Sequence, residues 1–151
     1  MFICTGNTCR SPMAAALAER MLLADTVLSA GLSVTRGSSA SGLAVEVMHK
    51  YGIDLSGHVS RCVTELMVEG ADIVLAMTNH HKEALKKRYP GYGRKIFTLG
   101  EYTGVGGDID DPFGGDANDY GECAKIIKGM LEKVKHILNI TEVWRDEEYF
   151  G

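Results

Sequence analysis

Near the start of the chain, a cysteine, an arginine and a serine lie in one short segment between an apolar run and a helix-like run. The segment reads Cys4-Thr5-Gly6-Asn7-Thr8-Cys9-Arg10-Ser11-Pro12 and directly follows the apolar residues 1–3. Pro12 favours a first helical turn, so the backbone amides of residues 5–10 are expected to point into one concavity. Such a nest at a helix N-terminus holds a phosphate-sized anion. The segment therefore predicts an anion-binding loop.

The residue types in this loop suit displacement at phosphorus. The positive field of an amide nest favours the thiolate form of a cysteine, which makes Cys4 the expected nucleophile. Arg10 carries a planar guanidinium that can bind two phosphate oxygens at once. No Gly-Lys-Ser or Gly-Lys-Thr follows the glycine, so a monoester-like phosphate is favoured over a nucleotide. A single cysteine after an apolar run is usually a buried core residue, and a single arginine at a helix start usually lies on the surface, but their combination in one such loop is rare.

Displacement at phosphorus leaves an alkoxide or an amine, which an acid on a facing loop must protonate. The Gly/Asp-rich stretch 100–116 contains Asp110 and Asp111, followed by Pro112 and Phe113. Asp111 is favoured as the acid because Pro112 keeps it out of helical geometry and fixes its direction. By itself an Asp-Pro pair more often serves turn chemistry or a calcium-like site. Beside the Cys4 loop, the catalytic interpretation is favoured.

Length and composition predict one globular domain over residues 1–151, with an acidic, aromatic tail at about 142–151. The sequence has no apolar stretch of about 18 residues and no signal peptide, so we expect a cytoplasmic protein that does not bind membranes. Its net charge of −4 argues against nonspecific binding to nucleic acid. Affinity for phosphate must therefore come from local groups.

The four cysteines, at positions 4, 9, 62 and 123, are too scattered for a secreted disulfide framework. No Cys-x-x-Cys pair occurs and the five histidines lack ligand spacing, so no metal is expected. Cys62 and Cys123 are expected to be structural. Cys9 lies close enough to Cys4 in a tight loop to form a disulfide with it.

The positioning elements alternate between strand-like and helix-like segments. Strands are predicted at 1–4, 26–30, 72–77 and 95–99, and helices at 13–24, 41–51, 64–69, 78–89 and 119–138. This alternation predicts a doubly wound (Rossmann-like) α/β fold with a four-stranded parallel sheet and helices on both faces. Ligands bind such sheets beyond the carboxyl ends of the strands, where Cys4 falls. The first strand is short, which leaves open a natural start upstream of Met1.

In order along nearly the whole chain, these segments resemble the low-molecular-weight protein tyrosine phosphatase family. The resemblance rests on residues 4–14, Ser29-Ala30-Gly31, residues 71–78 and Asp111-Pro112-Phe113-Gly114. It implies that Cys4 forms a phosphocysteine, that Arg10 clamps the phosphate, and that Asp111 acts first as general acid and then activates water. It further implies phosphorylated proteins as partners, inorganic phosphate as product, and neither a metal nor an organic cofactor.

The same resemblance implies roles for neighbouring residues. Asn7, Ser11 and Ser29 would support the loop by hydrogen bonds, with His58 as a partner of Asn7. The substrate would be bound by Thr5, Gly6, Asn7, Thr8, Cys9, Ser11 and Phe113.

Thr8 bears on the choice of substrate. Tyrosine-specific members of the family usually place a β-branched aliphatic residue there, whereas bacterial relatives acting on phosphoarginine carry threonine. The hydroxyl of Thr8 could orient water or hydrogen-bond a guanidinium, and the aromatic face of Phe113 accepts either a phenyl ring or a guanidinium. Asp110 or Asp111 could also attract the positive guanidinium. Phosphoarginine is therefore favoured, and phosphotyrosine stays the alternative.

Two other functions are open to a chain with this loop. Arsenate reductases share the fold and the loop, but they carry in addition a downstream pair of cysteines. Cys62 and Cys123 are far apart and neither lies near residues 78–100, which makes this alternative remote. A noncatalytic phosphate sensor would need neither a nucleophile nor an acid, so the presence of Cys4, Arg10 and Asp111 together argues against it.

Overall fold

A four-stranded, all-parallel sheet with strand order β2-β1-β3-β4 forms the centre of the molecule. The computed structural model describes residues 1–21 and 23–150, with the backbone alone for residue 140 and residues 142–150. The strands are β1 (Phe2–Cys4), β2 (Ser29–Gly31), β3 (Val74–Ala76) and β4 (Ile96–Thr98). The predicted parallel sheet is confirmed. Each strand spans three residues, so β1 is no shorter than its neighbours.

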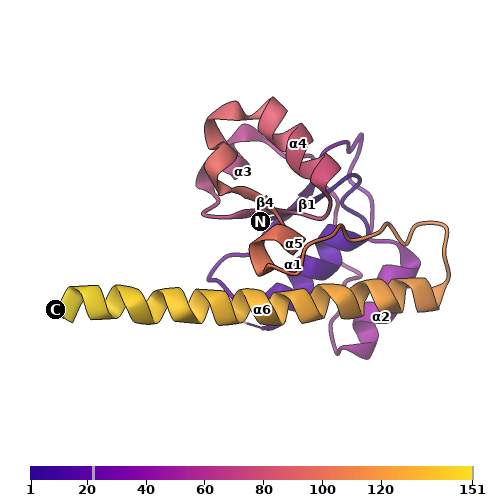
Figure 1. The fold of residues 1–151 in the computed structure, drawn as a ribbon. Helices are drawn as coiled ribbons and strands as arrows, with labels where there is room; N and C mark the ends of the chain where they lie inside the picture. The colour runs from indigo at the N-terminus through magenta and orange to yellow at the C-terminus, as the bar shows by residue number, and fades with distance from the viewer. Residues whose placement is uncertain (22, 151) are drawn as a thin grey trace.

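Helices cover both faces of the sheet, as predicted (Figure 1). Successive strand residues point to opposite faces, which divides the core into two clusters. Phe2 and Leu75 pack with α1 (Arg10–Arg20), α2 (Gly42–Lys50), α5 (Leu99–Thr103) and α6 (Ala117–Phe150). Ile3 and Val74 pack on the other face with α3 (Glu65–Gly70) and α4 (Asn79–Arg88). Burial on both faces explains why these strands are nearly continuous apolar runs.

Hydroxyl side chains cap the N-termini of α2, α3 and α4. Ser41 Oγ accepts a hydrogen bond from Ala44 N, and Thr64 Oγ1 accepts one from Met67 N. In α4, Thr78 Oγ1 accepts a hydrogen bond from His81 N. These caps satisfy backbone donors that the first helical turn leaves unpaired.

Several predicted boundaries are wrong. Helix α1 begins at Arg10 instead of residue 13, because the anion loop runs directly into its first turn, and it ends at Arg20 rather than at residue 24. Strand β2 covers Ser29–Gly31 rather than residues 26–30. Helix α6 begins at Ala117 and continues to Phe150, past the predicted end at residue 138. The side chains of the predicted tail, residues 142–151, lie outside the described part of the structure.

The stretch 100–116 is only partly a loop. Its first residues belong to α5, which a reciprocal pair of hydrogen bonds between Thr98 and Glu101 caps at 2.9 Å each. The residues Pro90–Lys95 form a 3-10 helix, η1, that the sequence analysis did not predict. The irregular segment therefore spans residues 104–116, which brings Asp111 back toward the carboxyl end of β1.

The remaining cysteines differ in burial. Cys123 is buried, as expected of a structural cysteine, whereas Cys62 is exposed and contributes nothing to the core. For Cys62 the structural role stays a prediction, and its backbone forms a bridge with Gly31. Among the described residues, no helix is both long and apolar enough to cross a membrane.

Candidate active site

The loop between β1 and α1 wraps around the sulfur of Cys4. Cys4 is buried at the carboxyl end of β1, and its Sγ accepts a hydrogen bond from Asn7 N at 3.3 Å. Ser11 Oγ lies 2.9 Å from the same sulfur. Asn7 has φ 55°, a left-handed conformation that turns its amide inward and is uncommon outside glycine. The loop thus has the geometry of a nest whose amides stabilise negative charge.

Asn7 is held in this conformation by a network of buried hydrogen bonds. Its Nδ2 donates to Ser11 Oγ and to Ser29 Oγ, both at 2.9 Å, and its Oδ1 accepts from Arg61 N at 3.0 Å. His58 Nε2 lies 2.7 Å from Asn7 O. The structure therefore brings together all four residues for which the sequence predicted a supporting role. Arg61 is an additional member that the sequence analysis missed.

Arg10 links the anion loop to the segment that carries the candidate acid. Its buried guanidinium donates from Nη1 to Ile109 O at 3.0 Å and pairs through Nη2 with Asp111 Oδ2 at 3.2 Å. The Asp111 side chain is 52% exposed, and its Oδ1 accepts from Phe113 N at 3.2 Å. The turn at Pro112 thus directs one carboxylate oxygen to Arg10 and keeps the side chain accessible to a substrate.

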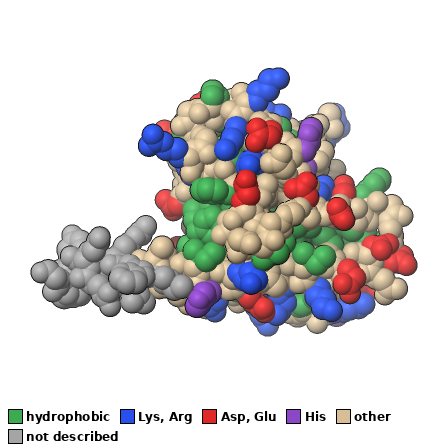
Figure 2. Space-filling view, in the orientation of Figure 1, with side chains coloured by type: hydrophobic (Ala, Val, Ile, Leu, Met, Phe, Trp, Pro, Cys, Tyr) green, Lys and Arg blue, Asp and Glu red, His purple; other side chains and the backbone are tan. Residues whose placement is uncertain are grey.

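Beside Asp111 lies an acidic groove of about 520 Å³. Its lining includes the carboxylates of Asp108, Asp110 and Glu122 and the apolar side chains of Phe113 and Ile126. The Phe113 side chain is 81% exposed, so the face of its ring is accessible to a ligand. Figure 2 shows acidic side chains gathered at the end of the molecule where α6 begins. The groove therefore combines an aromatic face with negative charge, and its Asp111 joins it to Arg10 of the anion loop.

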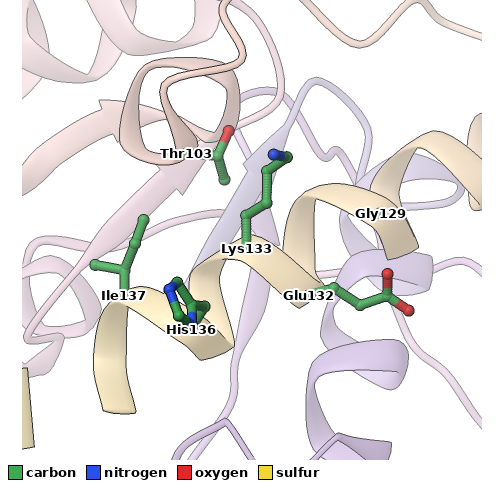
Figure 3. Close-up of a pocket in the computed structure, with 6 residues that line it drawn as sticks. All are labelled: Thr103, Gly129, Glu132, Lys133, His136 and Ile137. Carbon is green, nitrogen blue, oxygen red and sulfur yellow. The ribbon is translucent and has the colours of Figure 1, made fainter. Parts of the chain in front are cut away.

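A second cavity, of about 460 Å³, lies between α5 and α6 (Figure 3). It is lined by Thr103, Gly129, Glu132, Lys133, His136 and Ile137. It shares no residue with the anion loop, and its Glu132 pairs with Lys128. In the described part of the chain, no cluster of three His, Cys, Asp or Glu side chains is arranged to hold a metal ion.

Cys9 is the second buried thiol of the loop. Its Sγ lies 3.4 Å from Tyr120 OH and 3.7 Å from Thr8 Oγ1, and both Cys4 and Cys9 are free thiols. Burial raises the pKa of the Tyr120 phenol and raises the pKa of the Cys123 thiol to about 12. Cys123 is therefore a neutral thiol at physiological pH.

His81 is a further residue at the site that the sequence analysis did not single out. Its ring is buried in the first turn of α4, and its Nε2 lies 2.8 Å from Thr5 Oγ1. Burial disfavours the charged imidazolium, and the charge of Arg10 adds to this effect, so the pKa of His81 falls to about 4. The ring is consequently neutral at neutral pH.

Gly31 allows β2 to approach the anion loop closely. A Cβ at this position would lie 2.6 Å from Thr5 O and 3.1 Å from Asn7 N. We expect Gly31→Ala to lower kcat/KM for a simple aryl phosphate about tenfold, because the loop must shift to relieve this overlap. Gly42→Ala is the matched control, since a Cβ at Gly42 meets nothing within 4 Å. Full activity in Gly31→Ala would show that the close approach is not required.

Comparison with known proteins agrees with this geometry. Residues 1–146 match the family model of low molecular weight phosphotyrosine protein phosphatase. A protein-arginine-phosphatase from Bacillus subtilis is 44% identical over 139 residues, covering 89% of this chain and 92% of the relative. The low molecular weight protein-tyrosine-phosphatase PtpB from Staphylococcus epidermidis is 36% identical over 135 residues, covering 89% and 95%.

Solved structures extend the similarity to the fold. The YwlE arginine phosphatase from Geobacillus stearothermophilus superimposes with a TM-score of 0.89 at 39% identity, covering 94% of this chain and 93% of that one. A YwlE arginine phosphatase mutant with a phosphorylated active site serine superimposes with a TM-score of 0.86 at 42% identity, covering 91% and 93%. The family predicted from the sequence is thus confirmed. The chain belongs to the low molecular weight phosphotyrosine protein phosphatase family and is a hydrolase.

Proposed function

We propose that this protein removes phosphate from phosphorylated proteins in two steps through a phosphocysteine at Cys4, with phosphoarginine as the preferred substrate residue. The observation that carries this proposal is the convergence of a thiol, a guanidinium and a carboxyl group at one amide nest. Asn7 N lies 3.3 Å from the Cys4 sulfur, and Arg10 reaches Asp111 at 3.2 Å. A nucleophile, a phosphate clamp and a proton donor are thereby within reach of one phosphoryl group.

In the first step, the Cys4 thiolate attacks phosphorus, so that an S–P bond forms while the P–N or P–O bond to the substrate breaks. The loop amides and Arg10 stabilise the negative charge on the phosphoryl oxygens. Asp111 protonates the leaving nitrogen or oxygen. Ser11 Oγ, 2.9 Å from the sulfur, stabilises the thiolate before attack and again when it departs.

In the second step, the Asp111 carboxylate accepts a proton from water, and the water oxygen attacks phosphorus. The S–P bond breaks, releasing inorganic phosphate and restoring the thiolate. The similar structure of an arginine phosphatase mutant with a phosphorylated active site serine supports an intermediate in which the enzyme itself is phosphorylated.

The surroundings of the loop favour a guanidinium over a phenyl ring. Thr8 is half-buried, and among the described contacts its hydroxyl makes only the weak one to Cys9 Sγ. Asp108, Asp110 and Glu122 place negative charge along the groove beside Phe113. A cationic guanidinium gains from this charge and can stack on Phe113, whereas a neutral phenyl ring gains only the stacking.

A direct comparison tests the substrate preference. We expect kcat/KM to be higher on a phosphoarginine peptide than on a phosphotyrosine peptide of otherwise identical sequence. A reversed order would replace phosphoarginine with phosphotyrosine and leave the two-step mechanism standing.

Replacing Thr8 should change this preference. We expect Thr8→Val to lower the ratio of kcat/KM for phosphoarginine to that for phosphotyrosine about tenfold, because valine keeps the shape of threonine but loses its hydroxyl. Thr8→Ser retains the hydroxyl and should keep most of the ratio. If Thr8→Val leaves the ratio unchanged, Thr8 does not distinguish the two substrates.

We also propose that Cys9 protects the nucleophile from irreversible oxidation. Peroxide would oxidise the Cys4 thiolate to a sulfenic acid, and the Cys9 thiol would displace water from it to form a disulfide. Both thiols are buried in the same loop. Wild-type enzyme should then regain activity with a thiol reductant, whereas Cys9→Ser should not. Cys62→Ser, at an exposed position, is the control, and full recovery of Cys9→Ser would contradict the protective role.

A further inference from the structure

His81 combines deep burial with an unsatisfied polar atom beside the anion loop. Its side chain is 2% exposed, and its Nδ1 is buried without any hydrogen-bond partner. Its Nε2 makes one contact, to Thr5 Oγ1 at 2.8 Å. Unpaired buried polar atoms are rare and costly, which makes a purely structural use of histidine at this position unfavourable.

The ring of His81 lies among the charged groups of the site. The charges of Arg10, Asp108 and Asp111 act on it, as does the neighbouring ring of His80. The N-terminus of α4 also disfavours a positive charge at this position. A neutral ring neither competes with Arg10 for Asp111 nor repels a positively charged substrate group, so His81 can contact the anion loop without disturbing the charges of the site.

Thr5 connects His81 to the anion loop. It directly follows the nucleophile, its side chain is exposed, and its carbonyl is fixed by Ser33 N at 3.0 Å. Among the described residues, His81 is the partner of its hydroxyl. A hydroxyl has one hydrogen and two lone pairs, so whichever ring nitrogen carries the proton, at least one lone pair of Thr5 Oγ1 stays free. The buried ring of His81 thus holds this hydroxyl on the residue that directly follows Cys4.

We propose that His81 is a positioning residue that fixes the Thr5 hydroxyl as a hydrogen-bond acceptor for the guanidinium of phosphoarginine. The guanidinium carries only N–H donors, so it matches a fixed acceptor, whereas the phenyl ring of phosphotyrosine has no donor to offer. The pair adds a specificity contact, made by the anion loop and α4, to that of Thr8. This inference rests on the proposed function, because it concerns how the same site recognises its preferred substrate.

The test compares kcat/KM on matched phosphoarginine and phosphotyrosine peptides across paired variants. Thr5→Val and His81→Leu should each lower the phosphoarginine-to-phosphotyrosine ratio about tenfold. Thr5→Val removes the hydroxyl that accepts the hydrogen bond from the charged guanidinium, and His81→Leu removes the ring that holds this hydroxyl in place. Thr5→Ser should keep most of the ratio, and His81→Gln should restore it because the glutamine amide reaches the position of Nε2. His80→Leu is the matched control for His81→Leu: the adjacent residue is exposed and should leave the ratio unchanged.

The outcomes separate this inference from the proposed function. If wild-type enzyme favours phosphoarginine but Thr5→Val and His81→Leu lower both activities equally, the inference is overturned and the proposed function stands. If wild-type enzyme favours phosphotyrosine, the proposed substrate is wrong and the inference falls with it. If a thermal melt shows that His81→Leu is not folded, the test uses the phosphoarginine-to-phosphotyrosine ratio of Thr5→Val. This substitution is expected to leave the fold intact, because Thr5 is exposed and valine has the shape of threonine.

Discussion

Cys4→Ser is expected to lower kcat for hydrolysis of p-nitrophenyl phosphate by at least about 10⁴-fold, the scale of loss when a nucleophile is removed. The groups on the sulfur explain why serine cannot replace it. Asn7 N at 3.3 Å and Ser11 Oγ at 2.9 Å stabilise a thiolate, but neither can remove a proton from an alcohol. A serine at this position would therefore stay a neutral, weak nucleophile.

The control for this prediction is Cys62→Ser, which makes the same change at an exposed position and should keep kcat within about twofold. A thermal melt of Cys4→Ser would establish that the variant is folded. Substantial turnover by folded Cys4→Ser would contradict nucleophilic catalysis by Cys4.

Asp111→Asn is expected to lower kcat/KM by about 10²–10³-fold on aryl phosphates with poor leaving groups, and much less on activated ones. Asparagine preserves the size of the side chain but cannot protonate the leaving group. Poor leaving groups need that proton in the transition state, whereas good ones depart as anions. The measurement is a series of aryl phosphates whose phenols cover a range of acidity.

Asp110→Asn is the matched control, because this neighbouring carboxylate is exposed and no hydrogen bond or ion pair joins it to Arg10. Across the aryl phosphate series, the kcat/KM of Asp110→Asn should depend on the leaving group no more steeply than that of the wild-type enzyme. An equal loss on every substrate for Asp111→Asn would remove Asp111 as the general acid, and a steep dependence in Asp110→Asn would transfer the role to that residue.

Much of the fold follows from local patterns in the sequence. The run Asp-Ile-Val-Leu-Ala-Met around β3 and the hydroxyl caps Ser41 and Thr64 are short-range signals, and both kinds of element form as predicted. Helix α5 was missed because the glycines and aspartates that follow it dominate the composition of the segment. Its signal was nonetheless present: Thr98 and Glu101 have the spacing of a capping box.

The same distinction applies to the site. Residues 4–11 are contiguous, so their types and spacing predict an anion loop without knowledge of the fold. His81 and Arg61 reach that loop only through tertiary contacts, 76 and 54 residues from their partners Thr5 and Asn7. No local sequence pattern marks either residue. Both lie near the loop because the parallel sheet brings the ends of β1 and β2 and the start of α4 to one edge. Contacts of this kind have to be read from the structure.

The most direct test of the mechanism is to identify the residue that becomes phosphorylated during turnover. Asp111→Asn should accumulate the intermediate when given an activated aryl phosphate, because the first step then needs no acid while the second lacks its base. Rapid acid quenching followed by peptide mass spectrometry should find one phosphoryl group on Cys4, and none in Cys4→Ala/Asp111→Asn, which has no acceptor atom at this position. A phosphoryl group on another residue, or turnover with no phosphorylated enzyme, would contradict the phosphocysteine mechanism.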